Sequence, residues 1–237
     1  MAPVRRRRGA CSRPCSRSVH PNPEAAMRRQ PSERGAALVT MLFLMLALLM
    51  MSLSSTRAAL AGARSARYER DRQVAHAAAE AALRDAERDI EGAAGPASPR
   101  TAIFTALDAD AFDQRCSGRA EKTGLCKPAK GAAAPAWQAA DLAEAGVEYG
   151  RFSGRTLPTG SGSLPATAPR YLVELLPASP PAAQPLFRIT ALGVGADAAT
   201  VVVLQSYYRR ATGTIPAKRL GWREIANWPE LHRAASN

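Results

Sequence analysis

The fold of this chain is decided by the stretch from Arg34 to Arg57, which reads RGAALVTMLFLMLALLMMSLSSTR. No charged residue occurs between these two arginines, and the apolar run covers Ala36 to Leu53. A charge-free apolar stretch of this length is a candidate for a membrane-spanning helix. The run does not end in an Ala-x-Ala cleavage site and a break, as a secretory signal would, but continues without proline into a polar helical segment.

Much of the positive charge precedes this stretch. The formal net charge of the 237 residues is +12, and residues 1–35 contribute +7 of it through nine arginines and two glutamates. Basic residues before a membrane helix mark its cytoplasmic side, so we expect the N-terminus inside the cell and the C-terminal part outside. A charge gathered in this leader argues against a nucleic-acid-binding protein, and we predict no direct nucleic-acid partner.

The basic leader has two candidate starts. Residues 1–26 lack hydrophobic periodicity and are expected to be disordered, whereas Met27 opens the compact segment MRRQPSERG. We therefore interpret Met27 as the true start of translation. If translation begins at Met1 instead, Cys11 and Cys15 lie in a reducing cytoplasm, and neither they nor His20 are expected to form a metal site.

A single long helix is predicted from residue 36 to residue 91. This range contains no proline and one glycine, while Gly92 suits a C-cap and the prolines after it prevent resumption of the helix. Such a helix is about 84 Å long. Its second half has an apolar stripe at steps of three or four residues, formed by Ala75, Ala79, Ala82, Leu83, Ala86 and Ile90. We expect the opposite side to carry Arg84, Asp85, Arg88 and Asp89, with Arg84 paired to Glu80.

The part after the helix, residues 92–237, is predicted to form a globular head. Residues 92–170 are irregular, with a short helix near Thr101–Phe112. They contain Cys116 and Cys126, the two cysteines outside the leader, and an external compartment with nine intervening residues favours a disulfide between them. The alternative is two free thiols.

The C-terminal third of the chain is predicted to be β-structure. Strands are expected at residues 170–176, 186–194 and 200–210, with Phe187, Ile189 and Ala191 alternating against Arg188, Thr190 and Leu192. The tail, residues 211–237, is expected to add a final strand or a helical turn. A helix followed by an antiparallel meander gives an α+β fold.

Catalytic chemistry is not indicated. Residues 193–198 match the spacing of a dinucleotide-binding motif, but a β-branched run follows where a helix should begin, so a hairpin is expected. His20, His76 and His232 fall in separate segments, and no carboxylate pair lies in a pocket-forming context. We predict no enzyme activity, no cofactor and no metal.

Two segments of the N-terminal part carry a family resemblance, RGAALVTMLFLMLALLMMSLSSTRAA from Arg34 and ERDRQVAHAAAEAALRDAE from Glu69. They resemble the N-terminus of PilX-type minor pilins, the type IV pilus assembly proteins, with Asp71 to Arg84 as the most specific part. The Gly-Leu-Cys ending at Cys126 is also similar to that family, as are FRITALGVG and VVVLQSYYRR near the C-terminus. The resemblance implies a type IV pilin-like fold, a long helix packed on a small antiparallel sheet.

The resemblance also implies a function and a set of partners. A prepilin peptidase would cleave after Gly35, and Ala36 would be N-methylated. The partners would be other minor pilins, the major pilin and the inner-membrane assembly platform. The subunit would sit in the inner membrane with its head in the periplasm, and then in the pilus at the cell surface.

The fifth mature position is informative, because major pilins carry a glutamate there and this chain has Thr40. A neutral side chain cannot pair with a neighbour's N-terminal amine in an apolar filament core, so we expect a subunit that primes assembly at the tip. Two alternatives are open: a minor pseudopilin of type II secretion, and a signal-anchored periplasmic binding module that never polymerises. Whether the pilus serves motility, DNA uptake or adhesion stays open.

Overall fold

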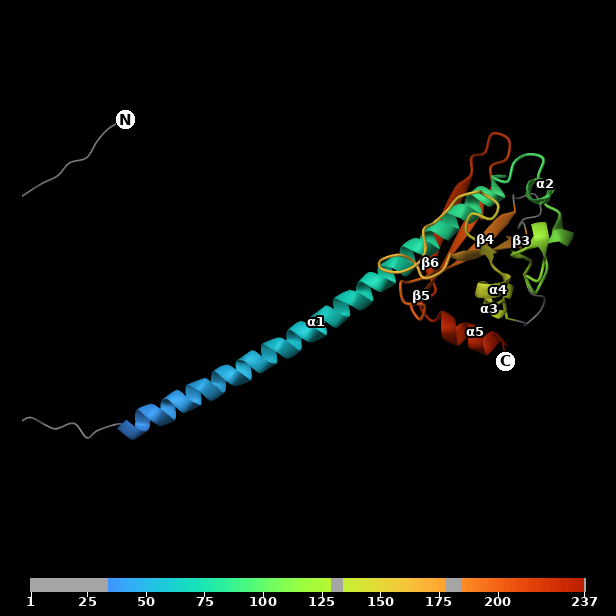
Figure 1. Ribbon diagram of the computed structural model, residues 1–237. Helices are drawn as coiled ribbons and strands as arrows, with labels where there is room; N and C mark the ends of the chain where they lie inside the picture. Colours follow the sequence, from blue (N-terminus) through green and yellow to red (C-terminus); the bar gives the residue numbers. More distant parts are fainter. Residues whose placement is uncertain (1–33, 129–133, 178–184, 237) are drawn as a thin grey trace, which may run out of the picture. The chain divides into compact units, whose positions relative to one another are not determined.

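The computed structural model describes residues 34–128, 134–177 and 185–236 (Figure 1). The predictions on the leader, including those on Cys11, Cys15, His20 and the start at Met27, lie outside these residues. The chain divides into two compact units, Met1–Thr56 and Arg57–Asn237. The first is represented by the beginning of helix α1, and the second holds the rest of α1 and all other elements.

Helix α1 covers Arg34–Ile90, close to the predicted residues 36–91. It ends as the sequence indicates, because Gly92 adopts a left-handed conformation with φ of 93°. The amide of Gly92 donates to the carbonyl of Asp89 at 3.0 Å, and that of Ala93 donates to the carbonyl of Arg88 at 2.9 Å. These bonds satisfy carbonyls that the helix end would leave free.

The second unit contains one six-stranded sheet and several short helices. After α1 the elements follow in the order α2 (Pro99–Ala106), η1 (Ala109–Ala111), η2 (Ala120–Lys122), β1 (Leu125–Cys126), α3 (Ala136–Ala139), α4 (Leu142–Ala145), β2 (Val147–Glu148), β3 (Arg170–Leu176), β4 (Leu186–Val194), β5 (Val201–Arg209), β6 (Lys218–Glu224) and α5 (Trp228–Ser236). The tail thus forms both a strand and a helix. The predicted helix near Thr101–Phe112 is divided between α2 and η1.

The sheet order is β1-β3-β4-β5-β6, with β2 also paired to β3. Strands β3 to β6 form the predicted antiparallel meander. The sheet as a whole is mixed, however, since β1 runs parallel to β3. This correction arises because β1 comes from the region predicted to be irregular, and its backbone pairs with the free edge of β3.

Helix α1 packs on one face of the sheet through the predicted stripe, whose six residues are at most 1% exposed. They meet the inward side chains of the strands, among them Phe187, Ile189 and Ala191. The closest approach is at Gly193 of β4, where a Cβ would lie 2.1 Å from the carbonyl oxygen of Ala75. Glycine at this position lets the strand lie directly against the helix backbone.

The polar side of α1 is where the prediction was wrong. Asp85 and Asp89 were expected opposite the stripe, but both are fully buried. The reason is that Arg100 of α2 and the turn at Gly150 lie on this side of the helix and supply partners for both carboxylates. Arg84 stays exposed and pairs with Glu80 as predicted.

The second face of the sheet is also covered. Thr190 and Leu192, which were expected to alternate with the inward residues of β4, are 1% and 9% exposed. Helices α3, α4 and α5 lie over this face (Figure 1), where Leu192 belongs to a cluster with Trp137 and Trp228. The head is therefore a sheet between two helical layers, and the alternation of the strands does not separate core from solvent.

Candidate functional site

The first candidate site is the apolar half of α1. From Leu38 to Leu53, every leucine, valine, methionine and phenylalanine side chain is between 51% and 72% exposed. The helix is long and apolar enough to cross a membrane, with a mean hydropathy of 2.5 in its most apolar window. Surface of this kind needs lipid or the apolar helices of other subunits around it.

The hydroxyl groups of this segment bond to their own helix. Thr40 donates to the carbonyl of Ala37 at 2.9 Å, and Ser55 and Thr56 donate to carbonyls four residues earlier at 3.0 Å. These hydroxyls can enter an apolar environment without losing their hydrogen bonds. Beside them, Gly35 and Ala36 lie within the first turn of α1, and a Cβ added at Gly35 would contact nothing within 4 Å.

The second candidate site is the start of the Asp71–Arg84 segment. Its first two residues connect α1 to the sheet. The carboxylate of Asp71 accepts from the amides of Ala196 at 2.6 Å and Asp197 at 3.0 Å, in the turn between β4 and β5. A hydrogen bond from Thr200 and these amides lowers the pKa of Asp71. The next residue, Arg72, pairs with Glu224 of β6 at 2.6 Å.

The third feature is a buried ionic network around Arg100, which is 0% exposed. Its guanidinium donates to Asp89 of α1, with Nη2 lying 2.6 Å from Oδ2, and the hydroxyl of Tyr171 donates to the same oxygen at 3.0 Å. Burial raises the pKa of Asp89, and the charge of Arg100 opposes that rise. One turn earlier, Asp85 accepts from the amide of Gly150 at 2.8 Å.

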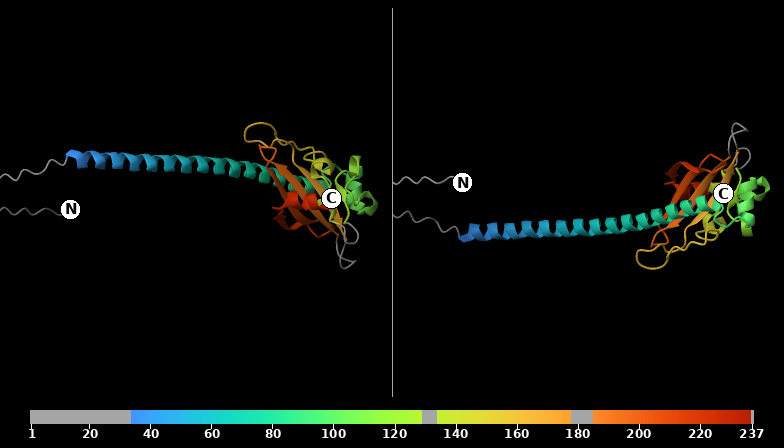
Figure 2. Two further views of the ribbon diagram at one scale, coloured as in Figure 1. Left: turned by 90° about the horizontal axis from the view of Figure 1, so that it is seen from below. Right: turned by 90° about the horizontal axis from the view of Figure 1, so that it is seen from above.

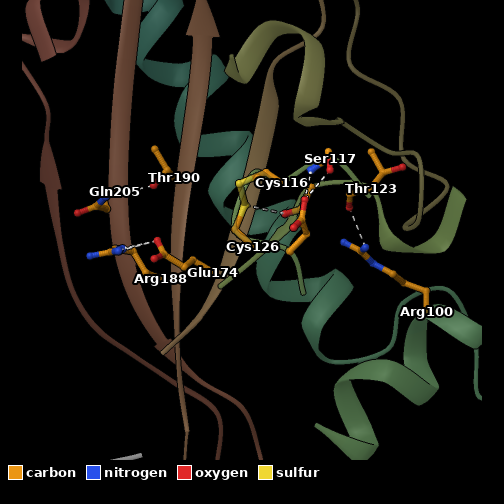
Figure 3. The surroundings of a disulfide bond; sticks show 11 residues. Arg100, Cys116, Ser117, Thr123, Cys126, Glu174, Arg188, Thr190 and Gln205 are labelled. Atoms are coloured by element: carbon orange, nitrogen blue, oxygen red, sulfur yellow. Dashed lines mark hydrogen bonds and ion pairs between the residues drawn. A yellow bond between two sulfur atoms is a disulfide. The ribbon is translucent and has the colours of Figure 1, made fainter. Parts of the chain in front are cut away.

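Arg100 also donates hydrogen bonds to the disulfide region. Its Nη1 donates to the carbonyls of Glu121 at 2.6 Å and Thr123 at 2.9 Å, inside the loop closed by Cys116 and Cys126 (Figure 3). The two cysteines are joined by a disulfide, with their Cα atoms 4.6 Å apart. Arg100 thereby links the disulfide loop to α1. The sequence signal for this network was the Asp85–Asp89 pair, one turn apart, which we expected opposite the apolar stripe.

The residues considered for other chemistry are not brought together. Gly195 donates its amide to the carbonyl of Thr200 at 2.8 Å, so residues 193–198 join two strands as a hairpin and do not open a helix. His76 lies against Trp222, and His232 stacks on Trp228 in another part of the head. Within the described residues, no group of three or more His, Cys, Asp or Glu side chains could hold a metal ion.

A long helix that is apolar and exposed in its first part and packed on a small sheet in its second part defines a pilin-like protein. The comparison with protein families agrees with this class. The family described as PilX N-terminal matches residues 34–84, and the one described as type IV pilus assembly protein PilX C-term matches residues 118–210. The chain belongs to the PilX family of type IV pilus assembly proteins. No curated protein and no solved structure matches it.

Membership in this family indicates the role and the location of the chain. The chain is a minor pilin with a role in pilus assembly, and its family is a structural component of the pilus rather than a known family of enzymes. The apolar helix together with the family indicates membrane anchoring and a location in the pilus.

The matched ranges include the Asp71–Arg84 segment and the strands β3, β4 and β5, and they end before β6 and α5.

Proposed function

We propose that this minor pilin primes pilus assembly and occupies the tip of the filament. The observation that carries the proposal is α1, whose first part exposes apolar surface while its second part is fastened to the head. The first part would lie in the inner membrane with the N-terminus in the cytoplasm, and the head would lie in the periplasm. After extraction, the same surface would pack among the helices of neighbouring subunits.

Processing is part of this proposal. The prepilin peptidase would cut after Gly35, and Ala36 would become the N-methylated first residue. A Cβ added at Gly35 would contact nothing within 4 Å, which supports a peptide bond that an enzyme can reach. The prepilin peptidase and the inner-membrane assembly platform would be transient partners, and the other minor pilins and the major pilin would be lasting ones.

The tip position is inferred from the charge at the fifth mature position. In a repeating filament, the amine of each added N-terminus needs a counter-charge in the apolar core, because an unpaired buried charge is costly. Thr40 has no charge, and its hydroxyl is bonded to Ala37. The subunit would therefore serve once, at the start of the polymer, and would be present in few copies.

The test is a deletion strain with quantification of sheared pili by mass spectrometry. We expect the deletion to reduce surface pili sharply while the major pilin stays in the membrane, and we expect N-methyl-Ala36 at the N-terminus of the wild-type subunit. A matched strain carrying Gly35→Glu should retain residues 1–35 and behave like the deletion.

Three results would count against the proposal. Unchanged piliation in the deletion strain would leave a non-polymerising anchored module as the better explanation. A copy number close to that of the major pilin would exclude the priming role. Loss of protein secretion with normal pili would identify a pseudopilin of type II secretion instead.

A further inference from the structure

Strand β6 is an open edge of the sheet. It pairs with β5 on one side, and it is the terminal strand in the sheet order. Trp222 and Leu220 of this strand are 57% and 48% exposed, and a Cβ added at Gly221 would contact nothing within 4 Å. An edge of this kind offers free backbone groups to another extended chain.

The edge is held firmly along α1. Three contacts join the two elements in antiparallel order: Arg219 with Glu87 at 2.6 Å, Trp222 with His76 at 6.0 Å between ring centroids, and Glu224 with Arg72 at 2.6 Å. Both views of Figure 2 show the last turns of α1 beside the C-terminal strands. The edge is therefore preorganised, which lowers the entropic cost of binding a further strand.

A cavity of about 110 Å³ lies between this edge and the helix. It is lined by His76, Glu80, Leu83, Leu204, Arg219 and Trp222. Its floor is apolar, because Leu83 and Leu204 are almost completely buried, and the indole of Trp222 forms an exposed wall. The cavity suits one aliphatic side chain that arrives with an extended backbone along β6.

The charged side chains of β6 indicate which kind of segment binds at this edge. Glu224 and Arg219 are already paired with α1, whereas Lys218 and Arg223 have no ion pair among the described residues, and Arg223 donates only to the amide oxygen of Gln205 at 3.0 Å. Lysine and arginine on an edge reject basic or neutral strands and accept an acidic one. The expected occupant combines an apolar residue with neighbouring carboxylates.

Antiparallel pairing with a second copy of this chain does not fit the edge. Two β6 strands in antiparallel pairing are related by a two-fold axis perpendicular to the sheet, so the α1 helices packed on the two sheets would run in opposite directions. Subunits anchored in one membrane leave it in the same direction. The opposite edge of a second copy offers little backbone, because β1 and β2 have two residues each and both residues of β1 are 0% exposed.

We propose that β6 and the adjoining cavity dock an acidic, extended segment from the head of a different pilin subunit, which adds a strand to this sheet. This inference rests on the proposed assembly function. It names a partner surface whose strand, β6, lies beyond the residues matched by the C-terminal family model. The two edges of the sheet also differ, since β6 is a seven-residue strand whereas the opposite edge carries the two-residue strands β1 and β2.

The test uses the full chain in cells with an intact pilus machinery. The photo-crosslinking residue p-benzoylphenylalanine replaces Trp222, and in a control strain it replaces Leu164, which is 37% exposed in the loop before β3. We expect position 222 to give one crosslinked subunit, which mass spectrometry identifies as a different protein with its own pilin-type leader and apolar helix. Position 164 should give at least five times less of that product.

A charge-reversed chain, Lys218→Glu with Arg223→Glu, should lose at least four-fifths of this crosslink and of the surface pili at unchanged protein level. The matched variant Lys218→Arg with Arg223→Lys should keep both. Crosslinks to lipid alone, to a copy of this chain, or equally from both positions would overturn the docking proposal. So would normal piliation in the charge-reversed chain. If the deletion strain lacks pili in the same experiment, the priming function survives such a failure.

Discussion

Removal of the charge on Asp89 should destabilise the head far more than its size suggests. In the variant Asp89→Asn, the guanidinium of Arg100 stays fully buried but loses its counter-charge. It keeps the carbonyls of Glu121 and Thr123 as acceptors, and these do not neutralise it. Loss of one partner of a buried ion pair typically costs about 3–5 kcal/mol.

The matched control breaks an exposed pair on the same helix. Glu80 and Arg84 keep side-chain exposures of 38% and 55%, so water screens their attraction. Removal of that pair by Glu80→Gln should cost at most about 0.5 kcal/mol. Both variants replace a carboxylate by its amide on α1, and the difference between them isolates burial.

The assay is urea unfolding of the full chain in detergent micelles, followed by the fluorescence of the buried Trp137 and Trp228. With a slope of about 2 kcal/mol per molar urea, Asp89→Asn should lower the midpoint by about 1.5–2.5 M. The shift for Glu80→Gln should be about 0.3 M or less on the same slope. Equal shifts for the two variants would refute the argument, because they would mean that Asp89 carries no charge in the folded head.

Three further changes test other parts of the structure. Replacement of Cys116 and Cys126 by serine should cost about 2–3 kcal/mol, and peptide mapping without reductant should find the two joined in the wild type. Gly193→Val should destabilise the head by about 3 kcal/mol through its contact with α1, whereas Gly221→Val on open strand β6 should change stability by about 0.5 kcal/mol or less in the same urea titration. Because the folded pKa of Asp71 is lowered, its contribution is present above the ordinary value of 3.8 and lost as pH falls through the folded pKa. Wild type and Asp71→Asn should therefore differ at neutral pH and converge in acid, as measured by circular dichroism.

The sequence alone was sufficient for the elements that depend on local patterns. The long helix and its end at Gly92 follow from a range without proline and a C-capping glycine. Strands β3 and β4 have the predicted bounds, because β-rich runs bounded by turn residues specify strands locally. The roles of Gly35, Ala36 and Thr40 were proposed from their order along the chain and stay predictions.

Only the tertiary structure decided which polar residues are buried. Asp85 and Asp89 were expected on the polar side of the helix, and they are buried because Arg100 and the turn at Gly150 lie against them. The open edge at β6 is equally invisible in the sequence, since strand order is a property of the whole sheet. Local patterns specify elements through nearest neighbours, whereas burial and edges depend on contacts between residues that are far apart in the chain.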